Sequence, residues 1–149
     1  MEIGQDFKEF IQLLNKHQVE YLVVGGYAVA MYGYPRNTDD IDFWVKSSQS
    51  NAKKIISTLV DFGFGTTDIH VEDFLKADAI VQLGFPPYRI DIITGFTGLS
   101  FDECFKNKKV IEIEGLSISF ISLFHLRLNK NATGGPKDLN DLNNLPLSD

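Results

Sequence analysis

Residues 21–45 of this 149-residue chain read YLVVGGYAVAMYGYPRNTDDIDFWV. The pattern predicts a strand over residues 21–24, a tight turn at Gly25 and Gly26, and a short helix that begins at Tyr27. Because glycine has no Cβ, the free N–H groups at the start of that helix would be open to a phosphate. We therefore expect both glycines to present their backbone to phosphate groups.

A second strand is predicted over residues 40–45, where polar and apolar residues alternate at the start. This period of two places Asp40 and Asp42 on one face, whereas Asp39 points to the other. Two neighbouring carboxylates repel each other, and a divalent cation removes that cost. Mg²⁺ prefers hard oxygen ligands and usually takes one or two protein carboxylates together with water and phosphate oxygens. A phosphate cradle beside such a pair predicts a phosphoryl- or nucleotidyl-transfer site.

The glycine pair, the thirteen residues after it and the Asp40-Ile41-Asp42 motif resemble the signature of the polymerase-β-type nucleotidyltransferase superfamily. The alternative is a packing turn followed by a solvated acidic loop, but Phe43-Trp44-Val45 places Asp42 inside an apolar strand. The resemblance implies an α/β (α+β) fold, with a mixed β-sheet and flanking helices. It also implies a metal cofactor, two Mg²⁺ ions with Mn²⁺ as a substitute.

Two more strands are predicted, over residues 79–84 and 88–93. Asp91 interrupts the second one, where an unpaired buried charge would be costly. In the superfamily that the chain resembles, a third carboxylate comes from a neighbouring strand and completes the metal site, and the resemblance implies this role for Asp91. A structural salt bridge from Asp91 to Arg89 or Arg36 is the alternative.

Four further side chains are candidates for nucleotide phosphates. Arg36 and Thr38 precede the carboxylate pair by a few residues and offer a guanidinium fork and a hydroxyl donor. Each also has a structural interpretation, in which Arg36 neutralises a neighbouring aspartate and Thr38 caps the turn. Lys130 and Lys137 are candidates for the triphosphate, with a salt-bridged helix pair as the alternative.

Residues 82–91, 130–132 and 136–142 resemble a narrower group of small bacterial nucleotidyltransferase-like proteins. This group includes relatives of lincosamide nucleotidyltransferases and of the nucleotidyltransferase partners in abortive-infection toxin–antitoxin pairs. The family often has an arginine where this chain has Gly135, so the resemblance is incomplete there.

The remaining pattern predicts one domain over residues 1–149 with a helical C-terminal tail at about 122–145. An amphipathic helix is expected within residues 1–17, and a hairpin within 110–120. A helix over 47–62 is expected to bury Ala52, Ile55, Ile56, Leu59 and Val60, and residues 65–73 are expected to form a loop.

Composition narrows the functional class. The net charge of −6 and a pI near 5.0 disfavour non-specific binding of nucleic acid, which needs clustered Lys and Arg. The single cysteine, Cys104, permits no intrachain disulfide, and no segment has the length and apolarity of a signal peptide or membrane span. We therefore expect a cytoplasmic protein without membrane contact.

The sequence thus predicts a metal-dependent nucleotidyltransferase that moves a nucleoside monophosphate from a nucleoside triphosphate to a hydroxyl acceptor and releases pyrophosphate. Asp40 and Asp42 are expected to hold two Mg²⁺ ions with the triphosphate, and Asp91 to serve the acceptor side. The sequence does not identify the acceptor: a small molecule or a protein fits the acidic charge best, and an RNA end is the third alternative. The alternative is an antitoxin or regulatory binding module with little or no turnover, which would act with a protein partner or as a homodimer.

Overall fold

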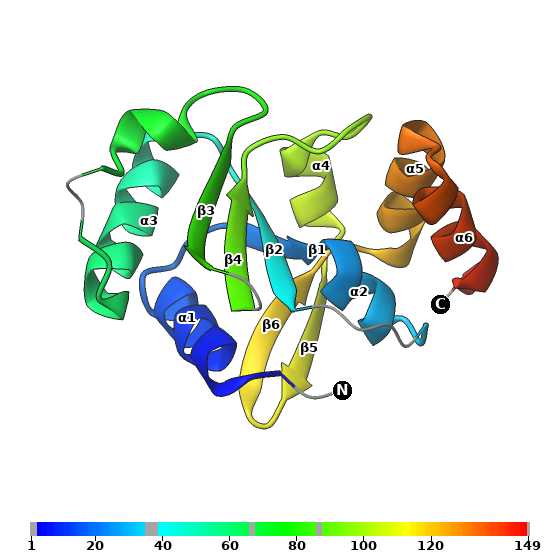
Figure 1. Cartoon of the computed structure of the whole chain (residues 1–149), viewed down its shortest axis with the longest axis horizontal. Coiled ribbons are helices and arrows are strands. Elements are labelled where there is room, and N and C mark those ends of the chain that lie inside the picture. The colour runs from blue at the N-terminus through cyan, green and yellow to red at the C-terminus, as the bar shows by residue number, and fades with distance from the viewer. Residues whose placement is uncertain (1–2, 35–38, 66–67, 86–87, 149) are drawn as a thin grey trace.

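The structure is a computed structural model, and it describes residues 3–34, 39–65, 68–85 and 88–148 (Figure 1). Within these residues, six strands form one mixed sheet in the order β3-β4-β2-β1-β6-β5. The strands are β1 (Tyr21–Val24), β2 (Asp40–Val45), β3 (Ile80–Phe85), β4 (Tyr88–Ile93), β5 (Lys109–Ile113) and β6 (Leu116–Phe120). The helices are α1 (Gln5–Lys16), α2 (Gly25–Met31), α3 (Gln49–Phe62), α4 (Phe101–Lys106), α5 (Leu123–Thr133) and α6 (Pro136–Asn144). The predicted mixed sheet with flanking helices is confirmed.

Successive residues of β2 point into two different layers of the molecule. The ring of Phe43 packs against Phe10 of α1, with 5.5 Å between the centroids, and Phe10 also contacts Phe62 of α3. The ring of Trp44 packs on the other side against Phe101 of α4, at 5.2 Å. The sheet therefore lies between two helical layers, and its alternation is the one that the sequence predicts.

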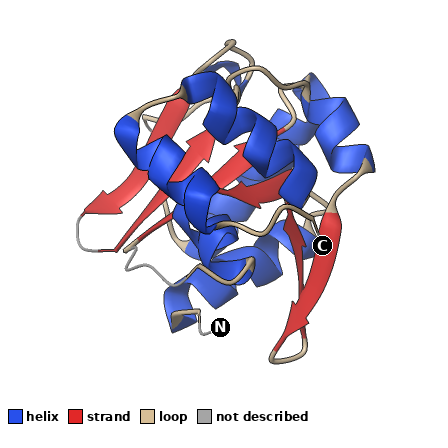
Figure 2. Cartoon of the chain, turned by 90° about the vertical axis from the view of Figure 1, so that its right-hand side faces the viewer, coloured by secondary structure: helices blue, strands red, loops and turns tan. Residues whose placement is uncertain are grey.

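The pair formed by α5 and α6 lies on the opposite side of the molecule from α3 (Figure 1). Figure 2 views the molecule from this side, with helices in front of the strands. The pair begins at Ser122, whose Oγ accepts a hydrogen bond from the His125 N–H, and Gly134 ends α5 in the left-handed conformation. None of the helices in the described ranges is long and apolar enough to cross a membrane.

A buried asparagine joins the ends of β1 and β2. Asn51 of α3 accepts the Glu20 N–H at Oδ1 (2.8 Å) and donates from Nδ2 to the carbonyls of Glu20 (3.1 Å) and Lys46 (3.0 Å). Glu20 precedes β1 and Lys46 follows β2, so one side chain satisfies backbone groups at both strand ends. This connection fixes where β2 leaves the sheet.

Three local predictions were wrong. Helix α2 begins at Gly25 instead of Tyr27, because Val24 already serves as its extended N-cap residue. Val60 is 55% exposed, since α3 buries only the side of Ala52, Ile55 and Leu59. A 3₁₀ helix at Val71–Phe74 lies where a loop was predicted, and the Asp73 carboxylate accepts the His70 N–H at its start.

Gly25 is the position where β1 must turn into α2. Its φ is +69°, and a Cβ built on it would collide with Oδ2 of Asp42. We expect Gly25→Ala to lower the free energy of unfolding by about 2 kcal/mol or more, because the strained φ and the displaced carboxylate both contribute. Urea unfolding at fixed pH measures this change.

Gly115 provides a matched control, because its φ is +80° but a Cβ there would meet nothing within 4 Å. Gly115→Ala carries only the cost of the left-handed backbone, about 1 kcal/mol. Equal losses for the two substitutions would show that the approach of Asp42 to Gly25 adds nothing to stability.

Candidate active site

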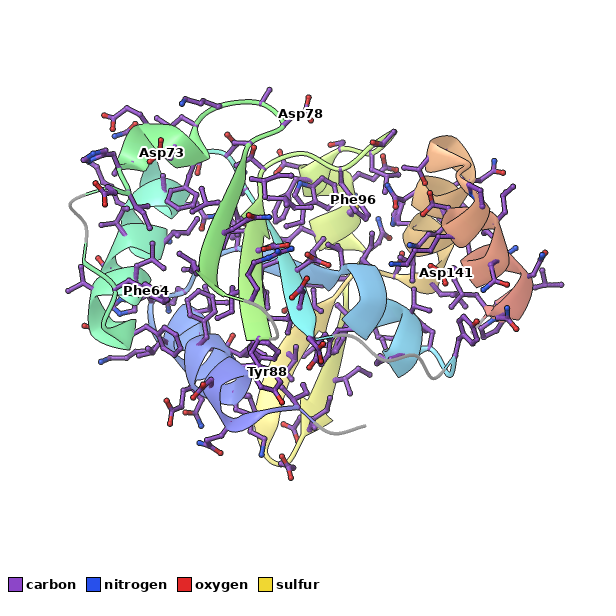
Figure 3. The ribbon with its side chains drawn as sticks, viewed as in Figure 1. Phe64, Asp73, Asp78, Tyr88, Phe96 and Asp141 are labelled. Carbon is purple, nitrogen blue, oxygen red and sulfur yellow. The ribbon has the colours of Figure 1, made fainter. Side chains whose placement is uncertain are left out.

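The pairing of β2 with β4 brings the predicted carboxylates together. The two strands are parallel, with Asp42 beside Asp91 and Asp40 beside Arg89. Since paired residues in neighbouring strands share a face, all four side chains lie on the same side of the sheet. Tyr88, labelled in Figure 3, is the first residue of β4, and Arg89 follows it directly.

Arg89 connects two of the three carboxylates. Its Nε donates to Asp91 Oδ1 at 2.7 Å, and its Nη2 donates to Asp91 Oδ2 and to Asp40 Oδ2, both at 3.1 Å. The guanidinium therefore forms a fork on Asp91 and reaches the neighbouring strand with the same nitrogen. The salt bridge between Asp91 and Arg89, considered as an alternative to metal binding, is present.

The surroundings of Asp42 oppose the negative charge of its carboxylate. Burial, together with the negative charges of Asp91 and Asp40 and a hydrogen bond to Asp91, raises the pKa of Asp42 from 3.8 to about 6, against a smaller lowering by Arg89. Ionising the second aspartate of the motif is therefore costly in the folded protein. A cation bound at its carboxylate would reverse that cost.

The start of α2 faces this carboxylate. Gly25 and Gly26 are the first two residues of the helix, and the N-cap residue Val24 offers no side-chain acceptor to their N–H groups. Val24 is also the residue that pairs with Asp42 across β1 and β2. The glycine backbone and the Asp42 side chain consequently meet, as the close approach at Gly25 shows.

The residues present fit a hard divalent cation. Carboxylate oxygens from three side chains on adjacent strands are the donor set that Mg²⁺ takes in proteins. Across the described ranges, however, no three or more His, Cys, Asp or Glu side chains are already arranged as ligands of one ion. Arg89 holds both oxygens of Asp91 and one of Asp40, so the carboxylates are gathered but turned toward the guanidinium.

The lysines proposed for the triphosphate belong to α5 and α6. Lys130 is 8% exposed and its Nζ lies 3.0 Å from Asp141 Oδ2 and 3.4 Å from Asp138 Oδ1, in the contact between α5 and α6. Figure 3 labels Asp141 in this helix pair. Lys137 is exposed in the first turn of α6. The structure therefore shows the salt-bridged helix pair that was the alternative for Lys130.

Three arginine and threonine side chains near the carboxylates in sequence differ in what the structure shows of them. Arg36 and Thr38 lie outside the described residues. Arg89 was considered only as a salt-bridge partner, although it stands two positions before Asp91 and therefore shares its face. That spacing is the signal that would have placed it in the site.

Two solved structures resemble this fold. One is a candidate nucleotidyltransferase from Thermotoga maritima, which is 15% identical over 93% of this chain and 88% of its own, with a TM-score of 0.64. The other is an antigenic nucleotidyltransferase-like protein from Paracoccidioides brasiliensis, which is 16% identical over 94% of this chain and 75% of its own, with a TM-score of 0.55. At these identities the two structures establish the fold.

The family is established by the sequence itself. Comparison with curated proteins gives no match. In contrast, residues 6–125 match the model of the aminoglycoside-2''-adenylyltransferase family, and this range contains the whole sheet, Gly25 and all three aspartates. The chain therefore belongs to the aminoglycoside-2''-adenylyltransferase family and is a nucleotidyltransferase.

Proposed function

We propose that this nucleotidyltransferase is metal-dependent and transfers a nucleoside monophosphate from a nucleoside triphosphate to a hydroxyl group, with release of pyrophosphate. The observation that carries the proposal is the register that sets Asp42 beside Asp91, with Gly25 against the Asp42 carboxylate. Carboxylates and a free helix start, held within contact distance, are the parts that nucleotidyl transfer needs.

Asp40 and Asp42 would hold Mg²⁺ together with the triphosphate, and Asp91 would complete the site on the acceptor side. When bound, the metal neutralises the phosphate charge and activates the acceptor hydroxyl. The backbone N–H groups at Gly25 and Gly26 would bind phosphate oxygens. The acceptor oxygen would then form a bond to the α-phosphorus while the bond from the α-phosphorus to the oxygen that bridges it to the β-phosphorus breaks, so that pyrophosphate leaves. Asp91 would accept the proton that the acceptor hydroxyl loses.

The family name suggests the substrates to test first. The name specifies adenylyl transfer to the 2'' position of an aminoglycoside, so we propose ATP as the donor and a hydroxylated small molecule as the acceptor. The net charge of −6 supports an acceptor that carries positive charge.

The function is tested by incubating the protein with each of the four ribonucleoside triphosphates, labelled at the α-phosphate, and a panel of hydroxylated acceptors. We expect label transfer from ATP that requires Mg²⁺ and is abolished by chelation. Transfer that continues at the same rate in excess chelator would contradict the metal-dependent mechanism.

Asp42→Asn should abolish Mg²⁺-dependent ATP binding while making the metal-free protein more stable. The raised pKa of Asp42 means that ionising it costs the folded state up to about 3 kcal/mol at pH 7.5, and asparagine removes this cost. Calorimetric titration with Mg²⁺–ATP and urea unfolding without metal give the two measurements. Asp102→Asn is the control, because Asp102 is an exposed carboxylate paired with Lys46. Undiminished ATP binding by the Asp42→Asn protein would remove Asp42 from the site.

The same carboxyl group predicts a pH dependence. Between pH 4 and pH 6 the folded protein binds a proton at Asp42 that the unfolded chain does not, so its contribution to stability is present at low pH and lost as pH rises through about 6. The stability advantage of Asp42→Asn over wild type should therefore grow from near zero at pH 4 to its full value above pH 7. A difference that stays constant across this range would show that charge is not its cause.

Asp91→Asn should stop transfer while leaving ATP binding within about threefold of wild type. If Asp91 serves mainly the acceptor side, its contribution is made in the transition state, and its loss should lower the single-turnover rate by about a hundredfold or more. Rapid-quench measurement at saturating acceptor gives this rate, and equilibrium titration gives the ATP affinity. A rate equal to that of wild type would exclude Asp91 from catalysis.

A further inference from the structure

Arg89 contacts the carboxylates of Asp40 and Asp91 on one face of the sheet. Three carboxylate oxygens accept from its guanidinium, two on Asp91 and one on Asp40, at distances of 2.7 to 3.1 Å. The side chains are sheltered: Arg89 is 25% exposed and Asp91 is 10% exposed. Because hydrogen bonds between charged groups strengthen with shelter from water, this arrangement holds Asp91 firmly.

The fork on Asp91 also conflicts with metal binding. Both oxygens of Asp91 are directed at Arg89, and an ion bound there would lie a few ångströms from a guanidinium that cannot lose its charge. Two cations at that separation repel each other strongly in a sheltered site. A divalent ion and the Arg89 fork therefore compete for the same carboxylate.

We infer that Arg89 is a built-in counter-cation, which keeps Asp91 and Asp40 gathered before metal binds and which the incoming divalent ion displaces from Asp91. Arg89 is thus a positioning residue that lowers the intrinsic metal affinity and stabilises the metal-free fold. The inference rests on the proposed metal-dependent function.

Binding of Mn²⁺ alone tests this competition. We expect Arg89→Gln to bind Mn²⁺ about tenfold more tightly than wild type in the absence of nucleotide, because the charge-assisted contacts that compete with the ion are removed. Electron paramagnetic resonance of free Mn²⁺ measures the affinity. The melting temperature of the metal-free variant should fall, since its carboxylates lose their counter-charge. Equal or weaker Mn²⁺ binding by Arg89→Gln would overturn the inference.

A control variant separates local competition from overall charge. Lys46→Gln removes one positive charge from the end of β2, where Lys46 pairs with the exposed carboxylate of Asp102 at 3.1 Å. Its Mn²⁺ affinity should change by less than twofold, because solvent screens a charge that is not in contact with the site. A gain as large as that of Arg89→Gln would assign the effect to net charge and overturn the inference.

The wild-type protein provides a measurement that needs no folded variant. The sequence contains three arginines, so the Nε–H signals in a spectrum of protein labelled with ¹⁵N-arginine can be assigned individually. The Arg89 Nε–H, bonded to Asp91 Oδ1, should exchange slowly without metal and at least tenfold faster in saturating Mg²⁺. Arg127, which donates to carbonyls at the end of α6, serves as the internal reference.

The outcomes distinguish this inference from the proposed function. Mn²⁺ or Mg²⁺ binding to wild type with no change at the Arg89 Nε–H would overturn the displacement and leave the metal-dependent function in place. If neither wild type nor Arg89→Gln binds Mn²⁺, even with ATP present, both proposals fail.

Discussion

The parallel pairing of β2 with β4 is the constraint on which the site depends, because it sets Asp42 beside Asp91 and Asp40 beside Arg89. A slip of one residue would carry Asp91 to the other face of the sheet, among the side chains that contact α1 and α3. That slip is opposed by the apolar residues between the charges: Ile41, Phe43 and Ile92 are almost fully buried. The positions of these carboxylates are therefore determined by the hydrophobic core beside them.

This arrangement concentrates negative charge at the centre of an otherwise well-packed sheet. Asp42 is held against Gly25 and beside Asp91, and its raised pKa expresses the cost. The core offsets that cost through contacts that do not involve the site, such as the Asn51 hydrogen bonds that join the ends of β1 and β2. The repulsion among these carboxylates therefore destabilises the fold until a cation binds. Arg89 provides one positive charge beside them from within the chain.

Much of this fold follows from the sequence because its periodicities are unambiguous. A polar residue at every second position located Asp40 and Asp42 on one face, and a charge inside an apolar strand identified Asp91. The partner of Asp91 and the first residue of α2 cannot be predicted from periodicity. From the sequence, Asp91 could be either a metal ligand or a salt-bridge partner. The structure shows a salt bridge from Arg89 to the Asp91 carboxylate, which is also the group that we propose as a metal ligand. Similarly, α2 begins at Gly25 because the backbone turns directly after β1. The low helix propensity of glycine instead favours a start at Tyr27.

The helical tail contains a buried lysine for which the sequence suggested a contact with the triphosphate. Lys130 is a reasonable candidate for a phosphate contact from sequence, but Asp138 and Asp141 already neutralise it inside the α5–α6 contact. Moving its ammonium to a triphosphate would break both of these ion pairs in the α5–α6 contact. The family match covers residues 6–125 and so ends near the start of α5. The ion pairs of Lys130 therefore lie in a part of the fold outside the matched range, while the carboxylates for which we propose a role in transfer lie on β2 and β4.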